Sequence, residues 1–408
     1  MSSHALSGWG RLAAFALLFQ AQLAWAGDDA ASLSADAAVA LALAAHPEVR
    51  QADASLQIAK ADRSGAALFL GNPSVSAWAT PDLERSSLTA TQPISLTGEG
   101  WHARSAARHA VGAAEESLAR TRRRVAAETR RAWLEVSVAT GRVQVAEEGA
   151  ELAKRLLYGV SRKTEEGEAS QLELRLARLS QVQAAVRVME AQRDQASALV
   201  VLTGWTLSPT DALSVTADPL GAAPPASANL PDERADVSAA RRALAAAEAD
   251  LSRERAASLP PLSVGVGVTV EDGATYIGPS VGIRVPLFDR NQSGRAAARG
   301  QTAVAESQLD ALIALAATEK RTAEARVSEA DSLTEVLGDD LQVDARAALA
   351  SVEAGVLAGE IDLATAVLLQ AQILAGETAI VNLRGLVASA RIDLLLATDD
   401  DALLGGAE

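Results

Sequence analysis

The chain contains no cysteine, which excludes a disulfide framework and thiolate metal ligands. Aromatic residues make up only 3% of the 408 residues, whereas hydrophobic residues make up 49%. Small aliphatic side chains suit long, closely packed helices better than a bulky globular core. The composition therefore predicts a mainly α-helical protein.

The sequence also lacks groups of residues in the patterns typical of a catalytic site. Of the four histidines, only His102 and His109 fall on one predicted helix, and their spacing puts them about two turns apart, too far to hold one metal ion. A formal net charge of −15 argues against nucleic acid as a partner. We predict that the chain is not an enzyme and has no catalytic residue, cofactor or resident metal.

The first 26 residues have the pattern of a secretory signal peptide. Arg11 supplies the positive charge, residues 12–23 form the apolar stretch, and Ala24-Trp25-Ala26 forms a cleavage site of small residues. No later segment approaches an uninterrupted apolar run of about 18 residues. The mature chain is predicted to leave the cytoplasm and to have no transmembrane helix.

Two large stretches of the chain repeat each other. The repeat rests on three landmarks in one order: Pro73 and Pro261, 188 residues apart, Pro93 and Pro286, 193 apart, and Gly167 and Gly359, 192 apart. Nearly one offset for three landmarks predicts an internal duplication.

The duplication divides the chain into segments. They are a signal peptide at 1–26, a first structural repeat at 27–203, a Pro-rich connector at 204–231, a second structural repeat at 232–397 and an acidic C-terminal tail at 398–408. Each repeat is predicted to contain a helix, two strands and a long helical hairpin. The predicted strands are 73–80, 86–96, 262–271 and 277–287, and the predicted hairpin helices are 100–163, 170–203, 294–356 and 362–396.

The helix lengths suggest how the helices are stacked. In the first repeat, the shorter helices at 48–70 and 170–203 together match the long helix at 100–163, which at ~1.5 Å per residue extends nearly 90 Å. Two half-length helices therefore fit end to end beside one full-length helix. Residues 170–203 also carry apolar side chains at the spacing of a coiled-coil seam. These are Leu172, Leu176, Leu179, Val182, Val186 and Met189.

The strands alternate between apolar and small or polar residues. In the third strand, Val264, Val266 and Val268 alternate with serine and glycine. This period is typical of a transmembrane barrel strand and equally of a solvated sheet with one buried face. Four strands cannot close a barrel in a bilayer, since open edges would leave backbone groups unpaired. If the strands span a membrane, three copies would supply twelve strands.

The chain resembles a known family, the TolC-like outer-membrane efflux proteins of tripartite pumps. The resemblance covers nearly the whole mature chain and lies in the order and spacing of four segments. They are residues 33–50, Asn72-Pro73, Gln92-Pro93-Ile94 and 167–173. The resemblance implies a homotrimer in which a twelve-stranded β-barrel in outer-membrane lipid, with four strands per chain, continues as an α-helical barrel into the periplasm.

The resemblance also implies roles for the hairpin turns. In the family, the turn glycines contact the adaptor protein, and they correspond to Gly167 and Gly359. A helix C-cap with positive φ is the alternative reading of either glycine. Glu173, Asp362 and Thr365 are candidates for lining the pore aperture, with solvated helix faces as the alternative. The family's frequent aromatic residue three positions before the glycine is absent, because Thr164 and Val356 stand there.

An arginine-rich run lies in the middle of the long helix at 100–163. Arg122 and Arg123 are candidates for lining the channel of a tubular trimer. The alternative is a solvated or interhelical ion-pair face.

We expect a passive outer-membrane exit duct that works with a periplasmic adaptor, or membrane fusion, protein and an inner-membrane transporter. The stretch from Gln92 to Gly98 resembles the heavy-metal branch of the family, which implies a transporter of the resistance-nodulation-division (RND) type and export of metal ions or small toxic compounds. The alternatives are the exit duct of a type I protein secretion system and a soluble periplasmic coiled-coil adaptor.

Overall fold

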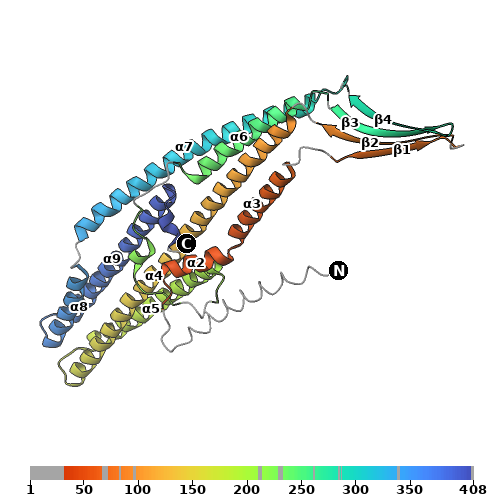
Figure 1. Ribbon diagram of the computed structural model, residues 1–408. Helices are drawn as coiled ribbons and strands as arrows, with labels where there is room; N and C mark the ends of the chain where they lie inside the picture. Colours follow the sequence, from red (N-terminus) through yellow and green to blue (C-terminus); the bar gives the residue numbers. More distant parts are fainter. Residues whose placement is uncertain are drawn as a thin grey trace.

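The computed structural model describes residues 32–66, 72–81, 84–94, 98–209, 214–227, 233–260, 262–283, 285, 287–337 and 341–405. The predicted signal peptide lies outside these ranges. The described part is an elongated body of long helices with a small sheet projecting from one end (Figure 1).

The order of elements in the first half of the chain is helix, hairpin of strands, long helical hairpin. The elements are α2 (Ala35–Ala45), α3 (Pro47–Ala66), β1 (Ser74–Ala79), β2 (Arg85–Ile94), α4 (Glu99–Glu165) and α5 (Gln171–Thr206). The same order recurs in the second half. Its elements are the 3₁₀ turn η2 (Pro219–Ala222), α6 (Ala235–Ala256), β3 (Leu262–Glu271), β4 (Ala274–Ile283), α7 (Gln292–Leu337), α8 (Leu341–Ala358), α9 (Leu363–Ala397) and η3 (Asp401–Leu404).

Helix α4 is the longest element and the one on which most of the other helices are assembled, whereas α7 packs on α6 and α9. Its 67 residues extend about 100 Å. As the helix lengths predicted, the shorter α3 and α5 both pack along it, α3 toward the sheet and α5 toward the far end (Figure 1). Helices α6 and α9 also pack on α4. The long helix therefore connects the sheet to the far end of the molecule.

The helix predicted at 294–356 is covered by α7 and α8, and residues 338–340 between them lie outside the described ranges. One sequence-based boundary was wrong. Strand β4 covers 274–283 and not 277–287, because Asp272 and Gly273 form a two-residue turn with φ of 51° and 80°. Positive φ at both turn residues is the geometry that tight hairpins require.

The four strands form one antiparallel sheet in the order β1-β2-β3-β4. Its register places apolar side chains in rows on one face; these include Val75, Ala77, Leu88, Val266, Val268, Ile277, Val281 and Ile283. The opposite face carries mainly serine, threonine and glycine; these include Ser76, Ser87, Thr89, Thr91, Gly265, Gly267, Gly278 and Ser280. The predicted alternation along the strands is therefore confirmed as two distinct faces.

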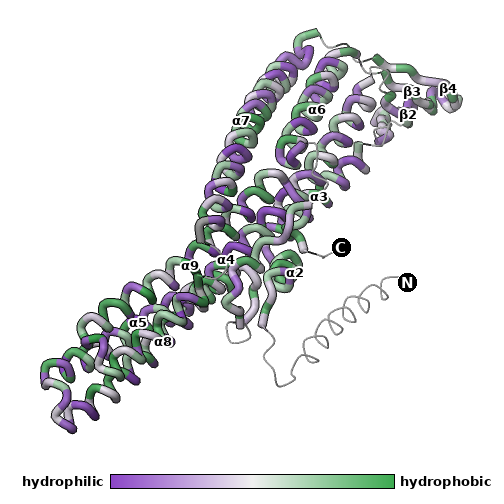
Figure 2. The backbone as a smooth tube through the Cα atoms, turned by 90° about the vertical axis from the view of Figure 1, so that its left-hand side faces the viewer, coloured by the Kyte–Doolittle hydropathy of each residue, from purple (hydrophilic) through white to green (hydrophobic). Residues whose placement is uncertain are grey.

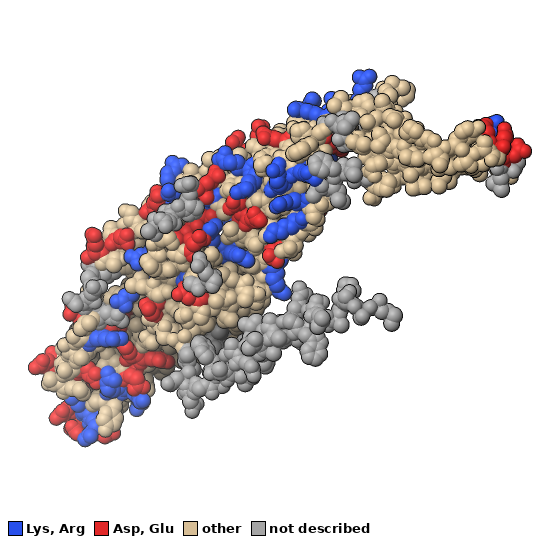
Figure 3. Space-filling view, viewed as in Figure 1, with Lys and Arg blue, Asp and Glu red and all other residues tan. Residues whose placement is uncertain are grey.

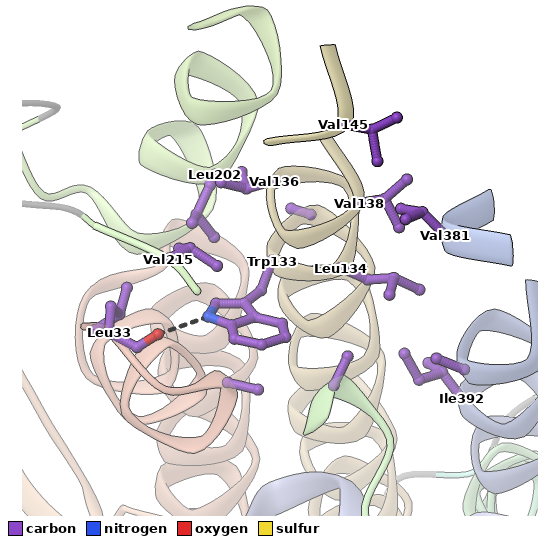
Figure 4. Packing of buried hydrophobic residues seen from close by; sticks show 14 of the residues in the cluster. Leu33, Trp133, Leu134, Val136, Val138, Val145, Leu202, Val215, Val381 and Ile392 are labelled. Carbon is purple, nitrogen blue, oxygen red and sulfur yellow. Dashed lines mark hydrogen bonds between the residues drawn. The ribbon is translucent and has the colours of Figure 1, made fainter. Parts of the chain in front are cut away.

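The main hydrophobic core lies where α2, α5 and α9 meet the middle of α4. Trp133 of α4 is 3% exposed, and its Nε1 donates to the Leu33 carbonyl oxygen over 2.7 Å (Figure 4). Leu202 from α5 and Ile392 from α9 are fully buried in the same cluster. These buried side chains fix the α2 segment and the second hairpin to one stretch of α4.

Helix α9 has the length and apolar composition of a membrane-crossing helix, which differs from the prediction that the mature chain has none. Its packing against α4, α7 and α8 buries 33% of its most apolar stretch.

The described part of the predicted acidic tail is packed into the helical body. Asp399 is 1% exposed in its side chain; it accepts from Arg120 Nη1 at 2.9 Å, from Arg123 Nη1 at 2.8 Å and from the Ala235 backbone nitrogen at 2.7 Å. Arg130, also 1% exposed, donates to the carbonyl oxygen of Leu403 at 2.9 Å. The arginine-rich part of α4 thus holds the C-terminal segment in place.

Replacing Asp399 with asparagine tests this anchor. Asparagine tolerates the left-handed backbone at this position, where φ is 61°, so the variant removes mainly the buried charge. Because Arg120 and Arg123 would lose a buried partner, we expect D399N to lower the free energy of unfolding by about 3 kcal/mol. Thermal or urea unfolding of the purified protein measures the change.

Asp401 provides the matched control, since it pairs with Arg123 at 2.7 Å but is 70% exposed. We expect D401N to cost less than about 1 kcal/mol. Equal effects of the two variants would contradict a special role for the buried carboxylate.

Candidate functional site

The two helical hairpins end in turns with the same backbone geometry. Gly167 and Gly359 have φ of 79° and 77°. After Gly167, the Glu168 nitrogen donates to the Lys163 carbonyl oxygen at 2.8 Å; after Gly359, the Glu360 nitrogen donates likewise to Gly355 at 2.9 Å. No heavy atom outside the chain neighbours lies within 4 Å of a Cβ built at either glycine. Each glycine therefore closes its helix and leaves an open surface at the tip.

The two tips are attached to each other (Figure 1). The Lys163 ammonium group at the end of α4 donates to the carbonyl oxygens of Val356 and Leu357 at the end of α8, both at 3.0 Å. Beside it, Val160, Ala177 and Leu363 form a small buried cluster from α4, α5 and α9. A cation at helix C-termini and shared apolar contacts thus hold the hairpins side by side.

The predicted aperture residues lie in the first turns of the returning helices, where they cap the helix ends. Ser170 and Glu173 form a capping box at α5: the Glu173 nitrogen donates to Ser170 Oγ at 3.2 Å, and the Ser170 nitrogen donates to Glu173 Oε2 at 2.6 Å. Asp362 caps α9 by accepting from the Thr365 nitrogen at 3.0 Å and from its hydroxyl at 2.5 Å.

The hydrogen bonds of these caps favour ionised carboxylates. The Ser170 backbone and side chain lower the pKa of Glu173 below its usual range, and the Thr365 hydroxyl and backbone do the same to the pKa of Asp362. Both tips therefore present negative charge.

The two candidate channel arginines have different surroundings. Arg123 is 13% exposed in its side chain and is occupied by its ion pairs with Asp399 and Asp401. Its contacts fit the interhelical ion-pair alternative. Arg122 is exposed on α4.

Helix α8 is separated from α4 by a groove of about 520 Å³. Two ion pairs bridge it, Arg155 to Glu353 at 2.7 Å and Arg346 to Glu148 at 3.2 Å. Glu377 of α9 lies next to this groove and was not predicted from the sequence. It is 2% exposed, and its carboxylate oxygens accept no hydrogen bond from the residues that the structure describes. Burial raises the pKa of Glu377, and the nearby negative charge of Glu148 raises it further, while the positive charge of Arg346 lowers it.

Within the described ranges, no group of three or more His, Cys, Asp or Glu side chains is arranged to hold a metal ion.

Comparison with solved structures reveals the fold. The chain superposes on CusC with a TM-score of 0.70 and 18% identity, covering 90% of this chain and 92% of that one. The outer-membrane channel OprN gives a TM-score of 0.72 and 20% identity over 91% and 90%. VceC, an outer membrane protein of Vibrio cholerae, gives 0.68 and 16% over 90% and 96%.

The chain has the fold of the TolC-like outer-membrane channels. The resemblance predicted from the sequence is confirmed at the level of the fold, and the predicted location, an outer membrane with a long helical extension, agrees with these neighbours. No family model matches the chain.

Two curated relatives have names that refer to metal resistance. The nickel-cobalt-cadmium resistance protein NccC of Alcaligenes xylosoxydans xylosoxydans is 30% identical over 59% of this chain. The cobalt-zinc-cadmium resistance protein CzcC of Cupriavidus metallidurans is 29% identical over 52%. The matches cover 56% and 53% of these relatives, about half of their length.

Substituting the tip glycines by alanine tests the role of positive φ. Since open space surrounds both positions, the cost of G167A or G359A comes from backbone strain alone, and we expect about 1 kcal/mol of destabilisation per substitution. Gly300 in α7 is the control: it also has open space but no positive φ, so G300A should stabilise by about 0.5–1 kcal/mol. If thermal unfolding shows that all three substitutions change the stability in the same direction, the role assigned to positive φ is contradicted.

Replacing Glu377 with glutamine tests its burial. A carboxyl group whose pKa is raised in the folded state destabilises that state increasingly as pH rises above the ordinary value of 4.5. E377Q should therefore raise the melting temperature at pH 7.5, and the gain should vanish near pH 4. A gain of equal size at both pH values would show that charge is not its cause.

Proposed function

We propose that the chain is the outer-membrane exit duct of a tripartite efflux system. Three copies would close a twelve-stranded β-barrel in the outer membrane and continue it as a helical tunnel into the periplasm. The chain would act as a passive conduit, while an inner-membrane transporter supplies the energy and a periplasmic adaptor connects the two.

The observation that carries this proposal is the uncharged sheet at the end of the long helical body. The four strands contain only two charged residues, Arg85 and Glu271, and both are at the end far from the helices. Figure 3 shows the uncharged sheet between the charged helical body and a charged tip. Strands of about ten residues, tilted by ~40°, suit an apolar band of about 25 Å.

The number of copies follows from backbone hydrogen bonding. Among the described strands, β1 and β4 are each paired on one side only. In lipid, both edges need a partner, and pairing β4 of one copy with β1 of the next closes a barrel. The recurrence of the element order in the two halves supports an internal duplication as the origin of the fold.

The helical end supplies the proposed contacts inside the periplasm. Gly167 and Gly359, with open space around them, would admit the adaptor protein. Glu173, Asp362 and Thr365 lie directly after these turns and would surround the aperture. Arg122, exposed on α4, stays our candidate for the channel wall.

The class of cargo is proposed from the relatives. NccC and CzcC are named for resistance to nickel, cobalt, zinc and cadmium. We propose metal ions or small toxic compounds as cargo and a transporter of the RND type as the pump.

Two neighbouring lysine substitutions in β1 test the membrane-facing sheet. Val75 is 68% exposed on the apolar face, and Ser76 is exposed on the opposite face of the same strand. A lysine facing lipid costs about 2–4 kcal/mol, so V75K should lose most of its assembly in the outer membrane, whereas S76K should assemble. Outer-membrane fractionation of both variants gives the answer. Loss of assembly in S76K with normal assembly of V75K would reverse the proposed orientation of the sheet.

A further inference from the structure

Two large aromatic residues interrupt the otherwise small and polar face of the sheet. Trp78 of β1 and Tyr276 of β4 belong to one row of the register, which runs through Ser87 and Thr269. Their exposed fractions are 56% and 61%. The whole chain contains only six tryptophans and two tyrosines, so large aromatics on this face stand out from its serine, threonine and glycine residues.

The two aromatic residues stand at the ends of this row, and the residues between them are small; we call the row with its two aromatic ends the groove. Trp78 and Tyr276 stand on the two outer strands, three strand spacings or roughly 14 Å apart across the sheet. The short side chains of Ser87 and Thr269 form the floor between them. The next row toward the helices, with Thr89, Gly267 and Gly278, is equally low. The space between the two rings is therefore open along the sheet.

An ion pair closes the end of the groove far from the helices. Arg85 and Glu271 are register partners two residues beyond Ser87 and Thr269, hence on the same face. Arg85 Nη2 and Glu271 Oε1 are 3.0 Å apart, with side chains 57% and 45% exposed. Aromatic rings favour a positively charged ligand with a flat apolar part, and the Glu271 carboxylate, paired with Arg85, lies in the neighbouring row on the same face.

We propose that the groove between Trp78 and Tyr276 binds aromatic organic cations as they leave the channel. The inference rests on the proposed function, because the small and polar face lines the lumen only if the apolar face meets lipid. Three copies would place three such grooves near the outer mouth of the barrel. A hydrated metal ion presents its water shell to the rings, so the grooves distinguish organic cations from metal ions.

Channel block in planar bilayers tests the proposal. The full-length protein is reconstituted, its current is recorded, and ethidium, a planar aromatic cation, is added at increasing concentration on the side of the strand turns. We expect block by ethidium and weaker block by naphthalene-1-sulfonate, an aromatic anion of similar flatness. W78A and Y276A should each raise the half-blocking concentration of ethidium about fivefold, whereas W78F should restore most of the affinity.

Control variants separate the groove from the rest of the barrel. I277A removes a similar volume from the residue next to Tyr276 but on the apolar face, and its block should match that of the unaltered protein. E271Q, which leaves Arg85 without its ion-pair partner, should weaken ethidium block and strengthen block by the anion.

The results distinguish failure of the groove from failure of the proposed channel. If the unaltered protein forms channels but W78A and Y276A are blocked as strongly as it is, the aromatic groove is wrong and the channel stands. If I277A weakens block as much as Y276A does, the effect belongs to barrel stability and the groove is wrong. If the unaltered protein carries no current at all, the proposed function fails, and the groove fails with it.

Discussion

The outer edges of β1 and β4 carry backbone N–H and C=O groups that no strand pairs within the described part of the chain. In water such edges are tolerable, but in a bilayer each unpaired group costs several kcal/mol. The sheet combines these open edges with an apolar face and an uncharged length of about ten residues. In the proposed channel, pairing edges between copies would satisfy the backbone and leave the apolar face to lipid. The proposed need for more than one copy thus rests on the strands themselves.

The long helices hold the sheet and the two hairpin tips far apart along one axis. Helix α4 does so as a single 67-residue element, with α3, α5, α6 and α9 arranged around it. Close approach depends on small residues: a Cβ added at Gly149 would lie 2.6 Å from Leu374 of α9. Figure 2 shows polar and apolar residues mixed along all the long helices. These helices carry exposed apolar side chains. Leu172 and Met189, in the predicted coiled-coil seam on α5, are examples.

Most of the fold could be predicted from the sequence because its signals are local. Breaks at proline and glycine mark the hairpins, and strict alternation in residues 262–271 marks a strand with two faces. The start of β4 was missed because the Asp272-Gly273 turn was not recognised as a two-residue hairpin turn.

The candidate site was less predictable because its roles depend on contacts between distant segments. The sequence identified Gly167 and Gly359 as equivalent, and both have the positive φ that the helix C-cap alternative requires. It could not show that Arg123 pairs with Asp399, 276 residues later, or that Glu377 is buried without a hydrogen-bond partner among the described residues. Both depend on how α9 packs against α4. The row that joins Trp78 to Tyr276 likewise exists only once the register of all four strands is known.

The number of chains in the native particle tests most directly whether the sheet edges pair between copies. The mature protein, extracted from outer membranes in mild detergent, is measured by native mass spectrometry, and the same sample is imaged by electron cryomicroscopy. A trimer with one closed barrel, in which β4 of each copy pairs with β1 of the next, is the predicted result. A monomer recovered from the soluble periplasmic fraction, with both sheet edges exposed to water, would contradict it.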